Sequence, residues 1–320
     1  TGPALTLLDC RGGTVKVLGQ YVGLGLASAA TMIDAAGDAG GGTVLVGGNY
    51  QGLGPEKNAT ATYVGPNATI NVDAVRTGNG GTAIVWSDDT TRFYGTISAR
   101  GGANSGDGGF VEVSGKGNLD FHGNVDPGAS NGVAGTLLLD PANIEISTNA
   151  DANSVGFAPP DDQIEAFTTD DTAANTVLNV TATAGSFAGV GAGTTIELQA
   201  TNDINVINNF DIATATGVAN VSLVLRAGKD INIGVTAAAT ITASGTGTIT
   251  LSADDNTPNG TGNVNIGGAA IVGGLVTAGQ AISITAANVV ITATGSINAG
   301  AGNVTLKPST ATPTVNVGTV

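Results

Sequence analysis

A short motif, a glycine followed by alternating apolar residues, recurs along this chain at a nearly constant spacing. The second and third copies begin 28 residues apart (81 to 109), and the third and fourth begin 26 residues apart (109 to 135). Short strands that recur at such a spacing between tight turns are typical of solenoids, in which each repeat forms one coil. The four copies are residues 42–46, 81–85, 109–113 and 135–139.

The 28-residue shift also aligns side chains outside the motif. It places Phe93 on Phe121, which predicts two rings stacked in consecutive coils. Parallel strands in neighbouring coils lie about 4.8 Å apart, so opposite charges at equivalent positions attract by roughly 0.2–1 kcal/mol. A shift of 27 residues aligns 69–73 with 96–100 in the same way. The predicted ladder pairs are Asp88 with Lys116, Arg92 with Asp120, and Asp73 with Arg100.

The C-terminal half repeats with a similar period. Residues 197–206 match 224–233 at a shift of 27, and residues 250–253 and 283–286 continue the pattern, the last after a longer turn. An antiparallel sandwich would also alternate apolar and polar residues, but it does not predict like residues at a constant shift. The chain is therefore predicted to be all-β, a right-handed parallel β-helix with coils of roughly 26–28 residues.

Two segments break the period and set the expected organisation. Residues 51–61 look like an insertion. The acidic, proline-containing segment 147–179 is expected to be an insertion or a boundary, with a short helix at 161–167. We expect a first β-helix segment over 1–146 and a second over 180–320, continuous with the first.

The composition narrows the function classes. The net charge of −15 disfavours nucleic-acid binding, which needs clustered Lys and Arg. No apolar run reaches the ~18 residues of a transmembrane helix, and Cys10, the single cysteine, cannot form an internal disulfide. The start of the chain has no basic n-region, so no signal peptide is predicted there.

Three blocks carry a resemblance to a known family. Residues 80–102, which include Trp86 and Arg92, together with 108–116 and 137–146, resemble filamentous-haemagglutinin-like exoproteins, the bacterial adhesins exported by two-partner secretion. The repeat 225–233 is similar to their haemagglutinin-type repeats. The resemblance implies a secreted protein at the cell surface that acts in adhesion, aggregation or biofilm matrix. The family's amino-terminal secretion domain with its Asn-Pro motifs is not visible, so the chain resembles a passenger segment.

The richest polar cluster surrounds residues 86–122. A glycan-contact face built from Trp86, Arg92, Tyr94 and His122 is one interpretation. The favoured interpretation is a structural ladder, because the charges form the coil-to-coil pairs given above and His122 falls on Tyr94 in the repeat. A catalytic site is not favoured, and the chain is predicted not to be an enzyme.

No cofactor is predicted. The turn at 254–260 is rich in Asp and Asn, but Pro258 stands where an EF-hand needs a ligand. An ordinary turn is therefore favoured, with a surface calcium site as the alternative.

These observations favour a structural extracellular protein. We expect an adhesin, matrix protein or fibre segment that self-associates into homo-oligomers or end-to-end filaments, because the exposed ends of a β-helix invite pairing. The alternative is a β-helix module that binds or cleaves polysaccharides, with a host-cell or matrix glycan as partner.

Overall fold

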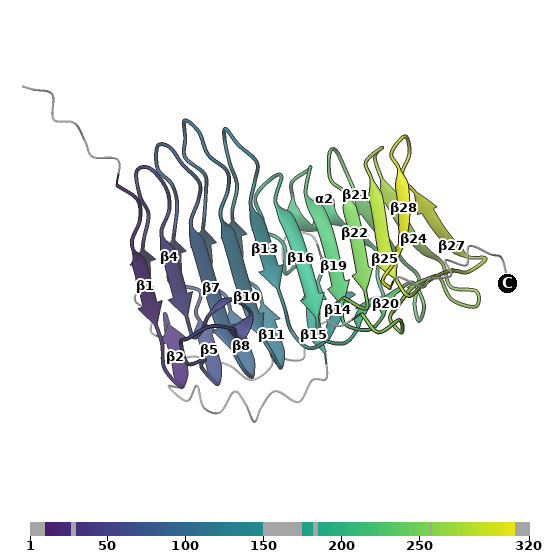
Figure 1. Cartoon of the computed structure of the whole chain (residues 1–320), viewed down its shortest axis with the longest axis horizontal. Helices are drawn as coiled ribbons and strands as arrows, with labels where there is room; N and C mark the ends of the chain where they lie inside the picture. Colours follow the sequence, from purple (N-terminus) through teal and green to yellow (C-terminus); the bar gives the residue numbers. More distant parts are fainter. Residues whose placement is uncertain (1–9, 27–29, 150–174, 182–184, 256–257, 311–320) are drawn as a thin grey trace, which may run out of the picture.

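The computed structural model describes residues 10–26, 30–149, 175–181, 185–255 and 258–310, which form an elongated stack of short strands (Figure 1). All pairings between named strands are parallel, and apart from β15 each strand pairs with its equivalent in the neighbouring coil. The fold is a parallel β-helix, as predicted. In the described part of the chain, no helix is long and apolar enough to cross a membrane.

One wall of the stack is a continuous ten-stranded sheet, called sheet A here (Figure 1). Within it Phe110 pairs with Thr82 on one side and with Thr136 on the other, which confirms the predicted spacings of 28 and 26 residues. In order along the stack the strands are β1 (Thr14–Val17), β4 (Thr43–Val46), β7 (Thr82–Ser87), β10 (Phe110–Gly115), β13 (Thr136–Leu139), β16 (Thr195–Ala200), β19 (Ser222–Ala227), β22 (Ile249–Ala253), β25 (Ile282–Ala286) and β28 (Val304–Pro308).

The second wall consists of two sheets. Sheet B contains β2 (Tyr21–Leu24), β5 (Ala61–Val64), β8 (Thr90–Phe93) and β11 (Asn118–Phe121). Sheet D contains β15 (Thr176–Asn179), β14 (Ile144–Ser147), β17 (Ile204–Val206), β20 (Ile231–Ile233), β23 (Asn263–Ile266) and β26 (Asn288–Ile291), in that spatial order.

The third wall is also divided. Sheet C contains β3 (Thr31–Asp34), β6 (Ala68–Asn71), β9 (Thr96–Ser98) and β12 (Asn124–Asp126). Sheet E contains β18 (Phe210–Asp211), β21 (Ala239–Ala243), β24 (Gly273–Thr277) and β27 (Gly295–Asn298). A short helix, α2 (Ile212–Thr216), follows β18, and the Asp211 side chain caps it by accepting the Thr214 N–H at 3.0 Å.

Strand β15 lies out of chain order. It pairs with one side of β14, whose other side pairs with β17. The Leu119 N–H of β11 donates to the Thr176 hydroxyl of β15 at 3.0 Å, so β15 fills the space between sheet B and β14. The fifth coil therefore contributes two strands to the second wall. This explains why β13 and β16, neighbours in sheet A, begin 59 residues apart (136 to 195).

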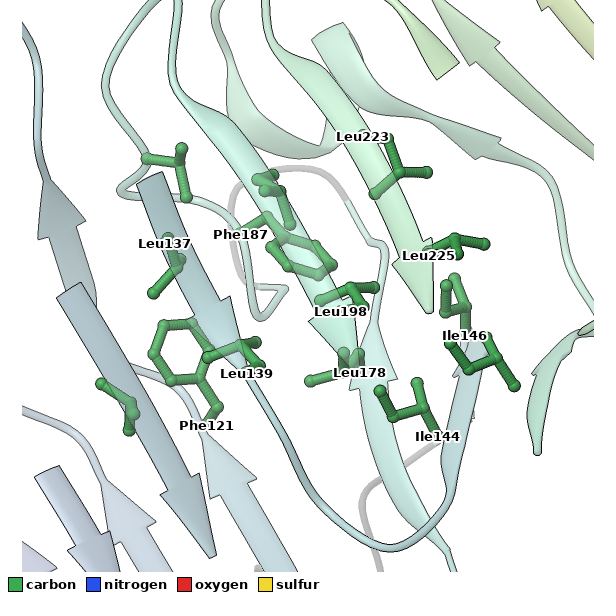
Figure 2. Close-up of a cluster of buried hydrophobic side chains, with 14 of the residues drawn as sticks. Phe121, Leu137, Leu139, Ile144, Ile146, Leu178, Phe187, Leu198, Leu223 and Leu225 are labelled. Carbon is green, nitrogen blue, oxygen red and sulfur yellow. The ribbon is translucent and has the colours of Figure 1, made fainter. Parts of the chain in front are cut away.

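The interior is a narrow column of stacked apolar side chains. The Phe93 and Phe121 rings lie parallel with centroids 5.6 Å apart, as the repeat predicted. Phe187 stacks on Phe210 at 5.4 Å and continues the column beside the fifth coil. Figure 2 shows this part of the core, where side chains from the first and second walls meet between the strands. Burial of such residues stabilises the fold by about 1.5–3 kcal/mol each.

The later repeats also have the predicted register. Glu197 pairs with Val224, Val224 with Thr250, and Thr250 with Ser283. Sheet A contains strands from both sides of the segment 147–179. The short helix expected at 161–167 lies outside the described residues.

Candidate functional site

The polar cluster predicted from the sequence lies on the outer face of sheet B. Phe93 and Phe121 point into the core, so the residues on either side of each ring point outward. Although outward-pointing, Arg92 is only 2% exposed and Asp120 is fully buried. The members of this sheet B cluster are Tyr63, Arg92, Tyr94, Asp120 and His122.

Contacts in the sheet B cluster converge on Asp120. The Tyr94 hydroxyl donates to its carboxylate, and His122 Nε2 lies 3.1 Å from Asp120 Oδ1. The Tyr94 and His122 rings stack with centroids 6.2 Å apart, as predicted. Burial and the Asp120 charge raise the pKa of Tyr94, so its hydroxyl remains a donor. Arg92 and Asp120 occupy paired positions on β8 and β11, which confirms their predicted register.

Trp86 does not join this cluster. It lies in β7 of sheet A, on a different wall, and is only 3% exposed. The indole ring is covered because Gly52 of an overlying loop packs against it, so Trp86 does not offer the exposed ring that a glycan-contact face would need. The indole N–H donates to Asp88 at 3.2 Å. The structure does not bring Trp86 together with Arg92, Tyr94 and His122 as a single face.

Two predicted ladder pairs have the expected register but other side-chain partners. The Asp73 carboxylate accepts the Ser98 hydroxyl and the Arg100 backbone N–H, both at 2.6 Å. The Arg100 guanidinium instead reaches forward one coil to Asp126 at 3.2 Å, because its side chain is longer than the coil spacing.

For the other pair, Asp88 accepts hydrogen bonds from Asn58, at 2.9 Å, and from Trp86. The ion pairs found among the described residues do not include Asp88 with Lys116, although both line one small hollow. The Asn58 amide and the Trp86 indole N–H therefore bind the Asp88 carboxylate in place of Lys116.

A second site, which the sequence did not indicate, lies on the outer face of sheet A. Residues 47–60, between β4 and β5, fold over β7 and β10 and include a 3₁₀ turn, η1 (Tyr50–Gly52). The Gln51 backbone N–H donates to both oxygens of Glu112, at 3.2 and 3.1 Å, and its side chain donates to Gln199 at 3.2 Å. The predicted insertion at 51–61 is thus a cover held onto the sheet.

The covered carboxyl groups have strongly shifted pKa values. Burial raises the pKa of Glu112 from 4.5 to about 8, against the lowering effect of the hydrogen bond from Gln51. Burial, and then the charge of Glu197, raises the pKa of Asp140 to about 7. Further along the sheet, Arg226 pairs with Glu197 at 2.5 Å and with Asp255 at 3.2 Å.

Hollows lie on both sides of the covering loop. The larger, of about 540 Å³, has an apolar floor that includes Ile84 and Phe110, with Tyr50 as part of its wall. The Tyr50 ring meets Phe110 edge-on at 5.6 Å and remains 48% exposed. The smaller, of about 230 Å³, has a mixed polar and apolar lining that includes Trp86, Asp140 and Gln199. We call the two hollows together the loop cleft.

Only part of the signal for this cleft is visible in the sequence. The broken period marked the insertion, and Glu112 occupies an outward position in an apolar strand. Nothing in the spacing says which wall an insertion covers, so the burial of Glu112 could not be predicted.

The Asp254 carboxylate accepts hydrogen bonds from its own turn and from Ser309, which follows β28. Burial alone would raise the pKa of Asp254, but hydrogen bonds from the Asn259 N–H, the Ser309 hydroxyl and the Gly260 N–H lower it. Within the described ranges, no group of three or more His, Cys, Asp or Glu side chains is placed to hold a metal ion. The alternative of a surface calcium site there stays a prediction.

No family model and no curated protein matches this chain. The resemblance to filamentous-haemagglutinin-like exoproteins therefore stays a prediction from the quoted motifs.

Proposed function

We propose that this chain is a structural β-helix of an extracellular bacterial adhesin, matrix protein or fibre, and that copies associate end to end. The supporting observation is the single parallel sheet of ten strands, which gives a stiff stack with equivalent backbone edges at its two ends. Within the described residues, β1 and β28 each have a ladder partner on one side only. Such edges are templates for another strand.

The inward side chains near the two edges support the same proposal. Leu306 in β28 takes the core position of Ile284 in the preceding coil, yet it is only partly buried, whereas Ile284 is fully buried. Val15 and Val17 in β1 are likewise only partly buried. Covering these groups with another coil would remove apolar surface from water at about 25 cal/mol per Å².

The test is the size of the purified protein as a function of concentration, by light scattering and electron microscopy. We expect rods whose length grows with concentration. Leu306→Lys, at the end of the core, should shorten them, while Thr305→Lys, on the lateral face of the same strand, should not. Particles that keep the length of one molecule at every concentration would contradict end-to-end association. Turnover of a polysaccharide would contradict the structural role.

The alternative, a glycan-binding or glycan-cleaving module built on the predicted face, gains no support from the geometry. Arg92 and Trp86 are buried on different walls, so they do not present one surface to a ligand.

A further inference from the structure

The loop cleft on sheet A combines features that a scaffold does not need. Its larger hollow leaves Tyr50 48% exposed and Leu53 70% exposed. A concave apolar surface with a few convergent polar groups is the usual form of a small-ligand site. The hollow lies over β4, β7 and β10, so it is built on rigid, hydrogen-bonded strands.

The aromatic ring is held in place from beneath. Tyr50 lies in the 3₁₀ turn η1, and the backbone of the next residue, Gln51, is fixed by the buried Glu112 carboxylate. Phe110 supports the Tyr50 ring edge-on. A ring held in this way offers a flat apolar surface at little cost in conformational entropy.

Planar polar side chains line both hollows of the loop cleft. Asn49 lines the larger hollow, and Gln199 and Asp140 line the smaller. An amide offers both donors and an acceptor, and a carboxylate offers two acceptor oxygens. These groups suit a ligand that carries several hydroxyls around an apolar ring face, which is the chemistry of a hexose.

Charge decides between neutral and acidic sugars. The pKa of Tyr50 is raised by partial burial first and then by the acidic groups Glu112, Glu197 and Asp140, while the Arg226 charge acts against this shift. Because the pKa values of Glu112 and Asp140 are themselves raised to about 8 and about 7, neither group carries a full charge at neutral pH. Lys116 lines the smaller hollow, but the larger hollow has no cationic side chain among its described lining residues. An anionic sugar would find no counter-charge in the larger hollow, so a neutral sugar fits it better.

We propose that the loop cleft is a binding site for neutral oligosaccharides, with the apolar face of one sugar ring against Tyr50 and the chain continuing along sheet A over β4, β7 and β10, the strands beneath the larger hollow. Consecutive strands lie about 4.8 Å apart, close to the length of one sugar unit, so successive units meet equivalent positions of successive coils. This proposal does not depend on end-to-end association.

The test uses the whole chain and Trp86, its only tryptophan, which lines the smaller hollow and reports binding by fluorescence. Neutral gluco-, manno- and galacto-oligosaccharides are titrated beside uronic-acid oligosaccharides of equal length. We expect saturable binding of at least one neutral series. Tyr50→Ala should weaken it by about tenfold or more, and Tyr50→Phe, which keeps the ring, should bind within about threefold of the original chain.

Tyr21→Ala is the matched control, because Tyr21 is also an exposed tyrosine, at 39%, but lies in β2 on another wall. Its affinity should be unchanged. Circular dichroism verifies that each variant is folded. The proposal is overturned by no neutral binding, by binding that Tyr50→Ala leaves intact, or by a preference for acidic sugars. None of these outcomes bears on whether rods form.

Discussion

The outer faces of the early and late coils differ, although their cores are alike. In β7 and β10 five of the six residues are buried, so both sides of these strands are shielded from water. In β16 and β19 burial alternates strictly, with every second residue partly exposed. The inward positions are buried in all four strands. Whether an outward-pointing charged side chain is buried therefore depends on what packs against the outer face of its strand, and not on the coil itself.

The same comparison can be made between single residues. Arg92 points outward from β8 and is 2% exposed, whereas Arg226 points outward from β19 with its side chain 39% exposed. Both lie in regular coils beside acidic groups. A buried charge depends on its partners far more than an exposed one, because water cannot replace them.

The largest expected effect comes from this pair of arginines. Arg92→Met should lower the free energy of unfolding by about 3–5 kcal/mol, since it leaves the Asp120 carboxylate buried without its cationic neighbour. Arg226→Met should cost ~1 kcal/mol or less, because Glu197 and Asp255 are partly hydrated. Urea denaturation followed by circular dichroism measures both. Equal losses of unfolding free energy in the two variants would contradict the conclusion that a shielded charge depends more on its partners than an exposed one.

A double variant tests the cause. If the uncompensated charge is responsible, Arg92→Met with Asp120→Asn should regain part of the stability that Arg92→Met loses. Simple addition of the two losses would instead indicate that packing, and not charge, is what Arg92 contributes.

The next largest effect is a pH dependence of stability that arises from the carboxyl groups beneath the covering loop. The folded-state pKa of Glu112 is raised to about 8, so the folded protein holds a proton that the unfolded chain has already released. The folded state therefore binds more protons between the two pKa values, and stability falls as the pH rises from about 5 to about 8. Glu112→Gln should flatten most of this slope and raise stability at about pH 8 by ~1–3 kcal/mol.

Thermal unfolding midpoints across this pH range measure the slope. Asp140, whose pKa is raised to about 7, should keep the remaining part of it in the Glu112→Gln variant. Glu145→Gln is the control, because Glu145 lies in β14 on another wall, away from the covering loop. A slope that Glu112→Gln leaves unchanged would contradict the assignment.

The repeat predicted from the sequence determines most of the fold, and the reason is physical. Each coil must place like residues above like, so Phe93 on Phe121 could be found by one constant shift. Strand β15 could not be predicted, because a short apolar strand such as Thr176–Asn179 fits any position on the second wall. Its spatial position next to β14 depends on the chain segment that connects the two strands, and a connecting segment leaves no periodic signal in the sequence.

Side-chain partners were predicted less well than register. The shift correctly set Asp73 beside Arg100, yet the guanidinium pairs with Asp126. Several polar groups lie within reach of each long side chain, and the choice among them depends on local geometry. The loop cleft was missed for a related reason, because the sequence does not show which face a long turn covers.

The smallest expected effect concerns the uncovered coils, where amide ladders take the place of a cover. On the outer face of sheet D, Asn232 donates to Asn205 at 2.9 Å and accepts from Asn265 at 2.8 Å. Each such bond contributes about 0.5–1.5 kcal/mol, and less where water competes. Asn232→Ala, which removes both bonds, should cost about 1 kcal/mol.

Asn265→Ala is the matched variant, since it removes only the bond to Asn232 and should cost about half as much. Hydrogen exchange of the β17, β20 and β23 amides localises the loss. If the ladder holds the uncovered coils together, exchange should accelerate in these strands and remain slow in β7 and β10, whose amides lie under the covering loop. Acceleration spread evenly over both regions would show that the stack opens as one unit, and that cover affects charge burial without creating a local difference in stability.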